Sequence, residues 1–242
     1  STNPRCAQIE ATAMRRHGVI NQPHFLETAQ EVEFQRAKWP LYREAGVMGP
    51  GLIFGHFVQA TPEMIAEAGA CGCGMVWQPT SNGRLASGFA NIRACLDAGM
   101  NVGVGLDDQS CTDISDPFGN MRFGIYSQRA NAKSPAAMGV AEMLRLHTLG
   151  SAQTLGVADK VGSLEVGKYA DFLLVDPRDP DTGPVWDPIG TYALACGLRN
   201  LKSVYVGGKL AAKDGRTTHP KAAEASAQLH ARLKRIAERI GG

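Results

Sequence analysis

The 242-residue sequence has no long apolar run, no strong net charge and no C-x-x-C pair. A helix that crosses a bilayer needs about 20 apolar residues, so no transmembrane helix is predicted. The formal net charge of +2 does not indicate a nucleic acid or an anionic membrane as partner. The first ten residues show no signal-peptide pattern and do not begin with Met. We therefore expect a cytoplasmic globular protein whose natural start was removed or lies upstream.

The cysteines are scattered along the chain, and only Cys71 and Cys73 lie close together. No second pair follows at zinc-finger spacing, so the pattern favours reduced thiols over a zinc site. The six positions are Cys6, Cys71, Cys73, Cys95, Cys111 and Cys196.

Strands and helices are predicted to alternate through the first half of the chain, which favours a parallel α/β architecture. The predicted strands cover residues 19–22, 52–56, 74–77 and 102–104. The predicted helices cover residues 7–16, 29–39, 62–69 and 90–98. Gly18 and Pro40 are expected to end the first two helices, and Thr61 with Pro62 to begin the third.

The second half of the chain has a different pattern. Helices are predicted over residues 121–130 and 136–149, with Gly150 and Gly156 as breakers. Short alternating strands with glycine turns over 161–176 predict an antiparallel region, and residues 202–210 a hairpin with a Gly-Gly turn. Residues 221–240 predict a basic helix on the surface, with a partner-binding role as the alternative.

The stretch from Asn101 to Asp108 predicts a buried strand that ends in two carboxylates, Asp107 and Asp108. Catalytic and metal-binding groups often lie at the carboxyl ends of parallel strands, where a rigid strand opens into a loop. An ordinary turn is the alternative, because Asp is common in turns.

Two other predicted strands also end in chemically capable side chains. One leads to His24 and Glu27, and another ends at His56. A single buried histidine is more often a core residue, but two histidines and Asp107 at neighbouring strand ends can converge on one point. Imidazole nitrogen and carboxylate oxygen suit zinc or iron. Such an ion makes hydroxide available at neutral pH, and Glu27 could carry its proton to a leaving group.

Five segments, in order, resemble the amidohydrolase superfamily in its chlorohydrolase and nucleobase-deaminase branch, which includes the cytosine and guanine deaminases. His24–Glu27 resembles the H-x-x-E at the end of barrel strand five, and Gly55–His56 the histidine that ends strand six. Pro79–Gly88 is similar to the P-x-S-N-x-x-L-x-x-G segment, and Gly103–Asp107 to G-x-G-T-D. Gly162–Asp171 resembles the G-x-I-x-x-G-K-x-A-D run that re-enters a small β-sandwich.

The resemblance implies roles for these residues in a metal-dependent hydrolase that displaces an amino or halide group from a heteroaromatic ring. His24 would be a metal ligand, and Asp107 a ligand that also accepts a proton. His56 would hold substrate or orient water, and in some members it counts as a ligand. Glu27 would protonate a ring nitrogen or the leaving group. Candidates for the pocket of this small heterocyclic substrate are Gln59, Trp77, Gln78, Asn82 and Asp108.

The sequence departs from the family pattern in three places. It contains no H-x-H, the pair that supplies the family's first two ligands, and nothing matches strands one to four. Trp77 or Gln78 stands where the family often has a histidine. Leu106 and Asp108 replace the Thr and the last Gly of G-T-D-G, which places a second acid beside the metal.

We therefore expect an α/β fold: the carboxyl-terminal half of a (β/α)8 TIM barrel, strands five to eight, with part of a β-sandwich. The half-barrel would cover residues 1–156, the β-sandwich portion 157–216 and the last helix 217–242. Four strands cannot close such a barrel, so the missing half is expected from the same or a second chain. One divalent ion, Zn or Fe, and a homo-oligomer are also expected. The alternatives are an inactive binding protein with this fold, and an unrelated α/β domain whose histidines and aspartate do not converge.

Overall fold

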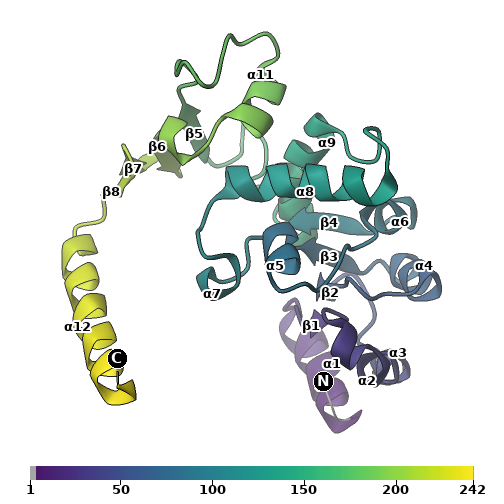
Figure 1. Cartoon of the computed structure of the whole chain (residues 1–242). Helices are drawn as coiled ribbons and strands as arrows, with labels where there is room; N and C mark the ends of the chain where they lie inside the picture. The colour runs from purple at the N-terminus through teal and green to yellow at the C-terminus, as the bar shows by residue number, and fades with distance from the viewer. Residues whose placement is uncertain (1–3, 242) are drawn as a thin grey trace.

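The computed structural model describes residues 4–241, which form two sheets of four strands each (Figure 1). The first sheet is parallel, in the order β1-β2-β3-β4. Its strands are β1 (His24–Phe25), β2 (Ile53–His56), β3 (Gly74–Trp77) and β4 (Asn101–Val104). Each strand pairs in parallel with the next one along the chain, so the four carboxyl ends lie together at the same end of the sheet.

Helices follow or connect these strands, as the alternating pattern predicts. They are α1 (Pro4–His17), η1 (Ala29–Glu31), α2 (Val32–Arg36), α3 (Trp39–Ala45), α4 (Pro62–Ala70), α5 (Pro79–Arg84), α6 (Ile92–Asp97), α7 (Gln109–Thr112), α8 (Pro117–Ala132), α9 (Val140–Arg145), η2 (Leu146–Gly150) and α10 (Ser151–Thr154). The predicted start of α4 is confirmed, because Thr61 is its N-cap and Pro62 its first residue.

Two predictions near the beginning of the chain are wrong. The strand expected at 19–22 begins later, at His24, and Asn21 forms only an isolated bridge with Leu52. Pro40 does not end a helix; it lies in the first turn of α3, where its missing N–H is not needed. The left-handed Gly46 ends α3 instead.

Gly150, expected to break a helix, lies inside one. The helix runs from α9 through the π-helical turn η2 into α10, and the left-handed Gly156 follows it. A Cβ at Gly150 would lie 2.6 Å from the carbonyl oxygen of Val102. Because Gly150 has no Cβ, η2 can pack closely on β4.

An aromatic cluster fills the core beneath β1 and β2. The rings of Phe54 and Phe57 stack with centroids 4.5 Å apart, and Trp39 stacks on both. Phe25 and Tyr42 complete the cluster. Large buried rings dominate core energetics, so this cluster fixes the positions of the strand ends above it.

The second sheet is antiparallel, in the order β5-β6-β7-β8. Its strands are β5 (Phe172–Val175), β6 (Leu201–Val206), β7 (Lys209–Lys213) and β8 (Arg216–Thr217). The predicted hairpin is confirmed, with Gly207 and Gly208 in the left-handed conformation between β6 and β7. The antiparallel region is shorter than expected, because residues 161–171 form bends, a turn and irregular backbone and contain no strand.

Between β5 and β6 lie three short helices, which contact the parallel-sheet part of the molecule. They are α11 (Pro188–Gly190), η3 (Thr191–Ala195) and η4 (Leu198–Asn200). Arg122 of α8 donates to the carbonyls of Leu194 and Cys196, at 2.9 and 3.2 Å. The Phe118 and Tyr192 rings also meet, with centroids 5.1 Å apart.

The predicted carboxyl-terminal helix is confirmed as α12 (Ala222–Ile240), which has no buried residue. It projects away from both sheets (Figure 1). Within residues 4–241, no helix is both long and apolar enough to cross a membrane.

Candidate active site

His56 is the centre of the site. It ends β2 and is fully buried. Its Nε2 lies 3.3 Å from His24 Nδ1, 3.6 Å from Glu27 Oε2 and 3.7 Å from Asp107 Oδ2. The four groups predicted from three strand ends therefore converge, so the alternative of an unrelated domain with a coincidental set of residues is wrong.

His24 and Glu27 come from the short strand β1 and the turn after it. The His24 side chain is 67% exposed, whereas that of Glu27 is 18% exposed. His24 Nδ1 and Glu27 Oε2 are 3.9 Å apart. Between them, Leu26 is fully buried with a φ of 55°, which turns the chain so that both polar side chains lie on the same side.

Asp107 follows β4 and is held by two donors. Ser81 Oγ donates to its Oδ2 at 2.7 Å, and the backbone N–H of Asp108 donates to its Oδ1 at 2.9 Å. Asp107 has a φ of 71° and His56 a φ of 67°. Left-handed backbone at non-glycine residues is strained and clusters at functional sites, so both strand ends carry the strain expected of an active site.

The segment after β3 forms a platform for these groups. Gln78 Oε1 accepts the backbone N–H of His56 at 3.1 Å, and Asn82 Nδ2 lies 2.9 Å from His56 Nδ1. Ser81 binds Asp107 from the same helix, α5. One short segment thus fixes side chains at the ends of two other strands.

Helix α8 holds this platform in place. Asn120 Oδ1 accepts the backbone N–H of Thr80 at 3.1 Å, and its Nδ2 donates to the carbonyl of Gly105 at 3.0 Å. A Cβ at Gly83 would lie 2.4 Å from Cζ of Phe123. The glycine therefore allows α5 to lie directly against α8.

Burial lowers the pKa of His56, although the Glu27 and Asp107 carboxylates oppose this effect. Asp108 is exposed, and hydrogen bonds from Ser110 and Cys111 lower its pKa. Its Oδ1 accepts the backbone N–H groups of both residues, which makes it the N-cap of α7. Burial thus disfavours the charged form of the His56 imidazole, which lies beside the Glu27 and Asp107 carboxylates.

The donor set fits a divalent metal ion. His24 supplies an imidazole nitrogen and Asp107 a carboxylate oxygen, and both kinds of ligand suit zinc or iron. Within residues 4–241, two groups bring potential ligand atoms within 4.8 Å of one another. One is His24, Glu27 and His56; the other is Asp107, Asp108 and Cys111.

The residues predicted to line a substrate pocket have different surroundings. Trp77, Gln78 and Asn82 are 2%, 5% and 1% exposed. Gln59 is partly buried and donates to the carbonyl of Ser87 at 2.6 Å, and Asp108 is exposed. Their contact with substrate stays a prediction.

Three side chains beside the site were not predicted. Ser81 lies within the quoted P-x-S-N segment, but the motif alone does not reveal its contact with Asp107. Asn120 and Cys111 carry no motif. Only their positions in the fold bring them to the platform and to the Asp107–Asp108 pair.

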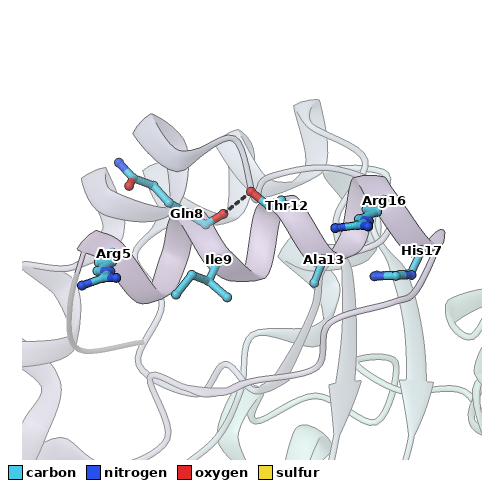
Figure 2. A pocket seen from close by; sticks show the side chains of 7 residues that line it. All are labelled: Arg5, Gln8, Ile9, Thr12, Ala13, Arg16 and His17. Atoms are coloured by element: carbon cyan, nitrogen blue, oxygen red, sulfur yellow. Dashed lines mark hydrogen bonds between the residues drawn. The ribbon is translucent and has the colours of Figure 1, made fainter.

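A shallow hollow on α1 is separate from this constellation. Figure 2 shows its lining, which includes Arg5, Ile9 and Arg16, and the hydrogen bond from Thr12 Oγ1 to the carbonyl of Gln8, 2.7 Å long. All of its lining residues belong to α1 and none belongs to the predicted site.

The chain is similar to curated deaminases over most of its length. The chain is 32% identical over 206 residues to a 5-methylthioadenosine/S-adenosylhomocysteine deaminase of Syntrophobacter fumaroxidans, covering 83% of this chain and 47% of that protein. It is 29% identical over 204 residues to a 5′-deoxyadenosine deaminase of Methanopyrus kandleri, covering 82% of this chain and 47% of that protein. The chain thus spans about half the length of the curated relatives it matches.

Solved structures have the same fold. A zinc-bound adenosine deaminase from Xanthomonas campestris superposes with a TM-score of 0.90 at 29% identity, over 98% of this chain and 55% of that one. A zinc complex of atrazine chlorohydrolase from Arthrobacter aurescens gives a TM-score of 0.84 at 25% identity, over 95% of this chain and 52% of that one. The model of the amidohydrolase family matches residues 7–211. The chain belongs to the amidohydrolase family.

Proposed function

We propose that this chain is part of a metal-dependent aminohydrolase that removes an amino group from a heteroaromatic ring by hydrolysis. The observation that carries the proposal is the convergence of His24, Glu27 and Asp107 around His56 Nε2, at the carboxyl ends of neighbouring parallel strands. Relatives that deaminate adenosine derivatives favour a ring of the purine type as substrate.

We also propose that the parallel sheet is half of a (β/α)8 barrel, within residues 1–156. Residues 157–216 would be part of a β-sandwich, and 217–242 a separate helix. The four strands lie in chain order, and β1 and β4 are the edge strands of the sheet. A further segment, of the same or a second chain, would pair with these edges and supply the H-x-H ligands. A homo-oligomer and a cytoplasmic location stay predictions.

The metal would be zinc or iron, held by His24 and Asp107 of this chain, with His56 as a further possible ligand. When bound, the ion would lower the pKa of a water and supply hydroxide at neutral pH. Asp107 Oδ2, which Ser81 keeps oriented, would accept one proton of the attacking water. Glu27, 18% exposed, would take up the other proton of that water and pass it to a ring nitrogen or to the leaving group.

Displacement of chloride is the second candidate, because a chlorohydrolase shares the fold. The same four side chains would activate water, and only the leaving group would differ. The alternative of a catalytically inactive binding protein has no support among the relatives named above, which are enzymes.

The test compares the wild-type protein with Asp107→Asn, each assembled with the further segment proposed above. Metal content by mass spectrometry and ammonia release from 5′-methylthioadenosine and adenosine are measured, with chloride release from a chlorotriazine in parallel. We expect Asp107→Asn to lose bound metal and nearly all turnover. Asp97→Asn is the control, because Asp97 is an exposed carboxylate in a weak ion pair with Arg93.

Unchanged metal content and turnover in Asp107→Asn would disprove the proposal. Chloride release without ammonia release would instead establish the second candidate. A wild-type assembly that binds no stoichiometric metal would favour the non-catalytic alternative.

A further inference from the structure

Asn82 and His56 form a buried pair. Their exposed fractions are 1% and 0%, and Asn82 Nδ2 lies 2.9 Å from His56 Nδ1. An amide nitrogen can only donate, and a neutral imidazole carries one N–H. If Nδ2 donates to Nδ1, the ring proton must lie on Nε2.

The surroundings of the other ring nitrogen agree with this assignment. Nε2 faces carboxylate oxygens of Glu27 and Asp107 at 3.6 and 3.7 Å, and the ring nitrogen of His24 at 3.3 Å. Each of these neighbours can accept a hydrogen bond. A proton on Nε2 is favourable there, whereas a lone pair would face other lone pairs.

The orientation of the Asn82 amide can be argued from its unpaired atoms. As placed, Oδ1 is buried without a hydrogen-bond partner, and Nδ2 uses one N–H on His56. The opposite orientation would leave both N–H groups unpaired. Buried N–H groups are orphaned less often than carbonyl oxygens, so the observed orientation is the better one.

Backbone hydrogen bonds hold Asn82 in place beside His56. The N–H of Asn82 donates to the carbonyl of Gln78, and the N–H of Ser87 donates to the carbonyl of Asn82, both at 2.9 Å. Gln78 in turn accepts the N–H of His56 at 3.1 Å. The His56 backbone and ring are thus both bound to one short segment.

We propose that Asn82 is a positioning residue that fixes the tautomer of His56, so that Nε2 carries the proton and points at the Glu27 and Asp107 carboxylates. The role of this tautomer in catalysis rests on the proposed hydrolase function. The tautomer itself is a property of the metal-free chain. With a proton on Nε2, His56 cannot also bind a metal through that atom, so it would act as a neutral N–H donor beside an ion held by His24 and Asp107.

The experiment is ¹⁵N NMR of the metal-free 242-residue chain with labelled histidine rings, in which His56→Gln identifies the His56 signals. We expect a pyridine-like Nδ1 and a pyrrole-like Nε2. In Asn82→Asp the side chain can only accept, so Nδ1 should gain a proton and become pyrrole-like. Asn91→Asp is the control: Asn91 is exposed, and its side chain caps α6 by accepting the N–H of Ala94.

A protonated Nδ1 in the wild-type chain would overturn the proposal, even if Asn82→Asp failed to fold. So would an unchanged Nδ1 signal in a folded Asn82→Asp variant. Neither result depends on metal or turnover, so the tautomer and the proposed function can fail independently.

Discussion

Removing the Ser81 hydroxyl should destabilise the chain more than removing a comparable buried hydroxyl. Ser81 is fully buried, and its Oγ donates to Asp107 Oδ2 at 2.7 Å. His56 Nε2, at 3.7 Å from that oxygen, lies outside hydrogen-bond distance. In Ser81→Ala, Oδ2 would therefore have no direct donor, while Oδ1 would keep the Asp108 N–H.

The magnitude follows from the charge and the burial of the acceptor. A hydrogen bond to a charged group contributes about 1.5–3 kcal/mol. The Asp107 side chain is 11% exposed, so water compensates only in part. We expect a loss of about 2 kcal/mol in the free energy of unfolding, or roughly thirtyfold in the equilibrium constant. Affinity for zinc should fall about 10–100-fold, as when other residues that orient metal ligands are changed.

The assay is urea unfolding of the metal-free chain, with zinc affinity measured by chelator competition in the assembled protein. Ser127→Ala is the matched control, because Ser127 is also buried and helical but donates to the neutral carbonyl of Gly124 at 3.0 Å. The free energy of unfolding of Ser127→Ala should fall by only about 0.5–1.5 kcal/mol. Equal losses in the two variants, with unchanged zinc affinity, would refute the assigned role of Ser81.

Three further predictions concern the rest of the chain. Gly69→Ala should cost about 1–3 kcal/mol in urea unfolding, because its Cβ would lie 2.1 Å from the carbonyl oxygen of Ala98; an unchanged midpoint would contradict this packing. Burial raises the pKa of Cys95 to about 12, so its thiol should stay protonated and unalkylated at about pH 8. Exposed Cys6 should react with iodoacetamide first, and equal rates would show that the core opens. Deleting residues 222–240 removes no buried side chain, so the melting temperature should not change; a clear fall would reveal a contact of α12 with the rest of the chain.

The sequence predicts the strand ends well because a buried strand shows a local pattern. Apolar runs that stop at His56 and Asp107 mark the carboxyl ends of β2 and β4. In the structure, these consecutive parallel strands pair in chain order. Where apolar residues are few, as before His24, the boundary of β1 is misplaced by several residues.

Other features depend on contacts between distant segments and could not be predicted. From the sequence alone, Pro40 could end one helix or begin the next. In the structure it lies in the first turn of α3, whose Trp39 and Tyr42 side chains pack in the core. The sequence predicts Gly150 as a helix breaker, and only the structure shows the backbone of β4 packed against it.

The platform of Gln78, Ser81 and Asn82 changes how the polar residues after β3 are interpreted. A sequence pattern shows that such residues follow a strand end, and a substrate pocket is the simplest explanation. The structure shows that one polar atom of each side chain already binds His56 or Asp107. A substitution of Gln78, Ser81 or Asn82 that suited a different substrate would also move His56 or Asp107, the groups proposed to perform the chemistry. These three positions are therefore poorly suited to determine substrate choice. Choice of substrate is better sought in exposed neighbours of the site such as Asp108, whose carboxylate binds Ser110 and Cys111 of the helix that it caps.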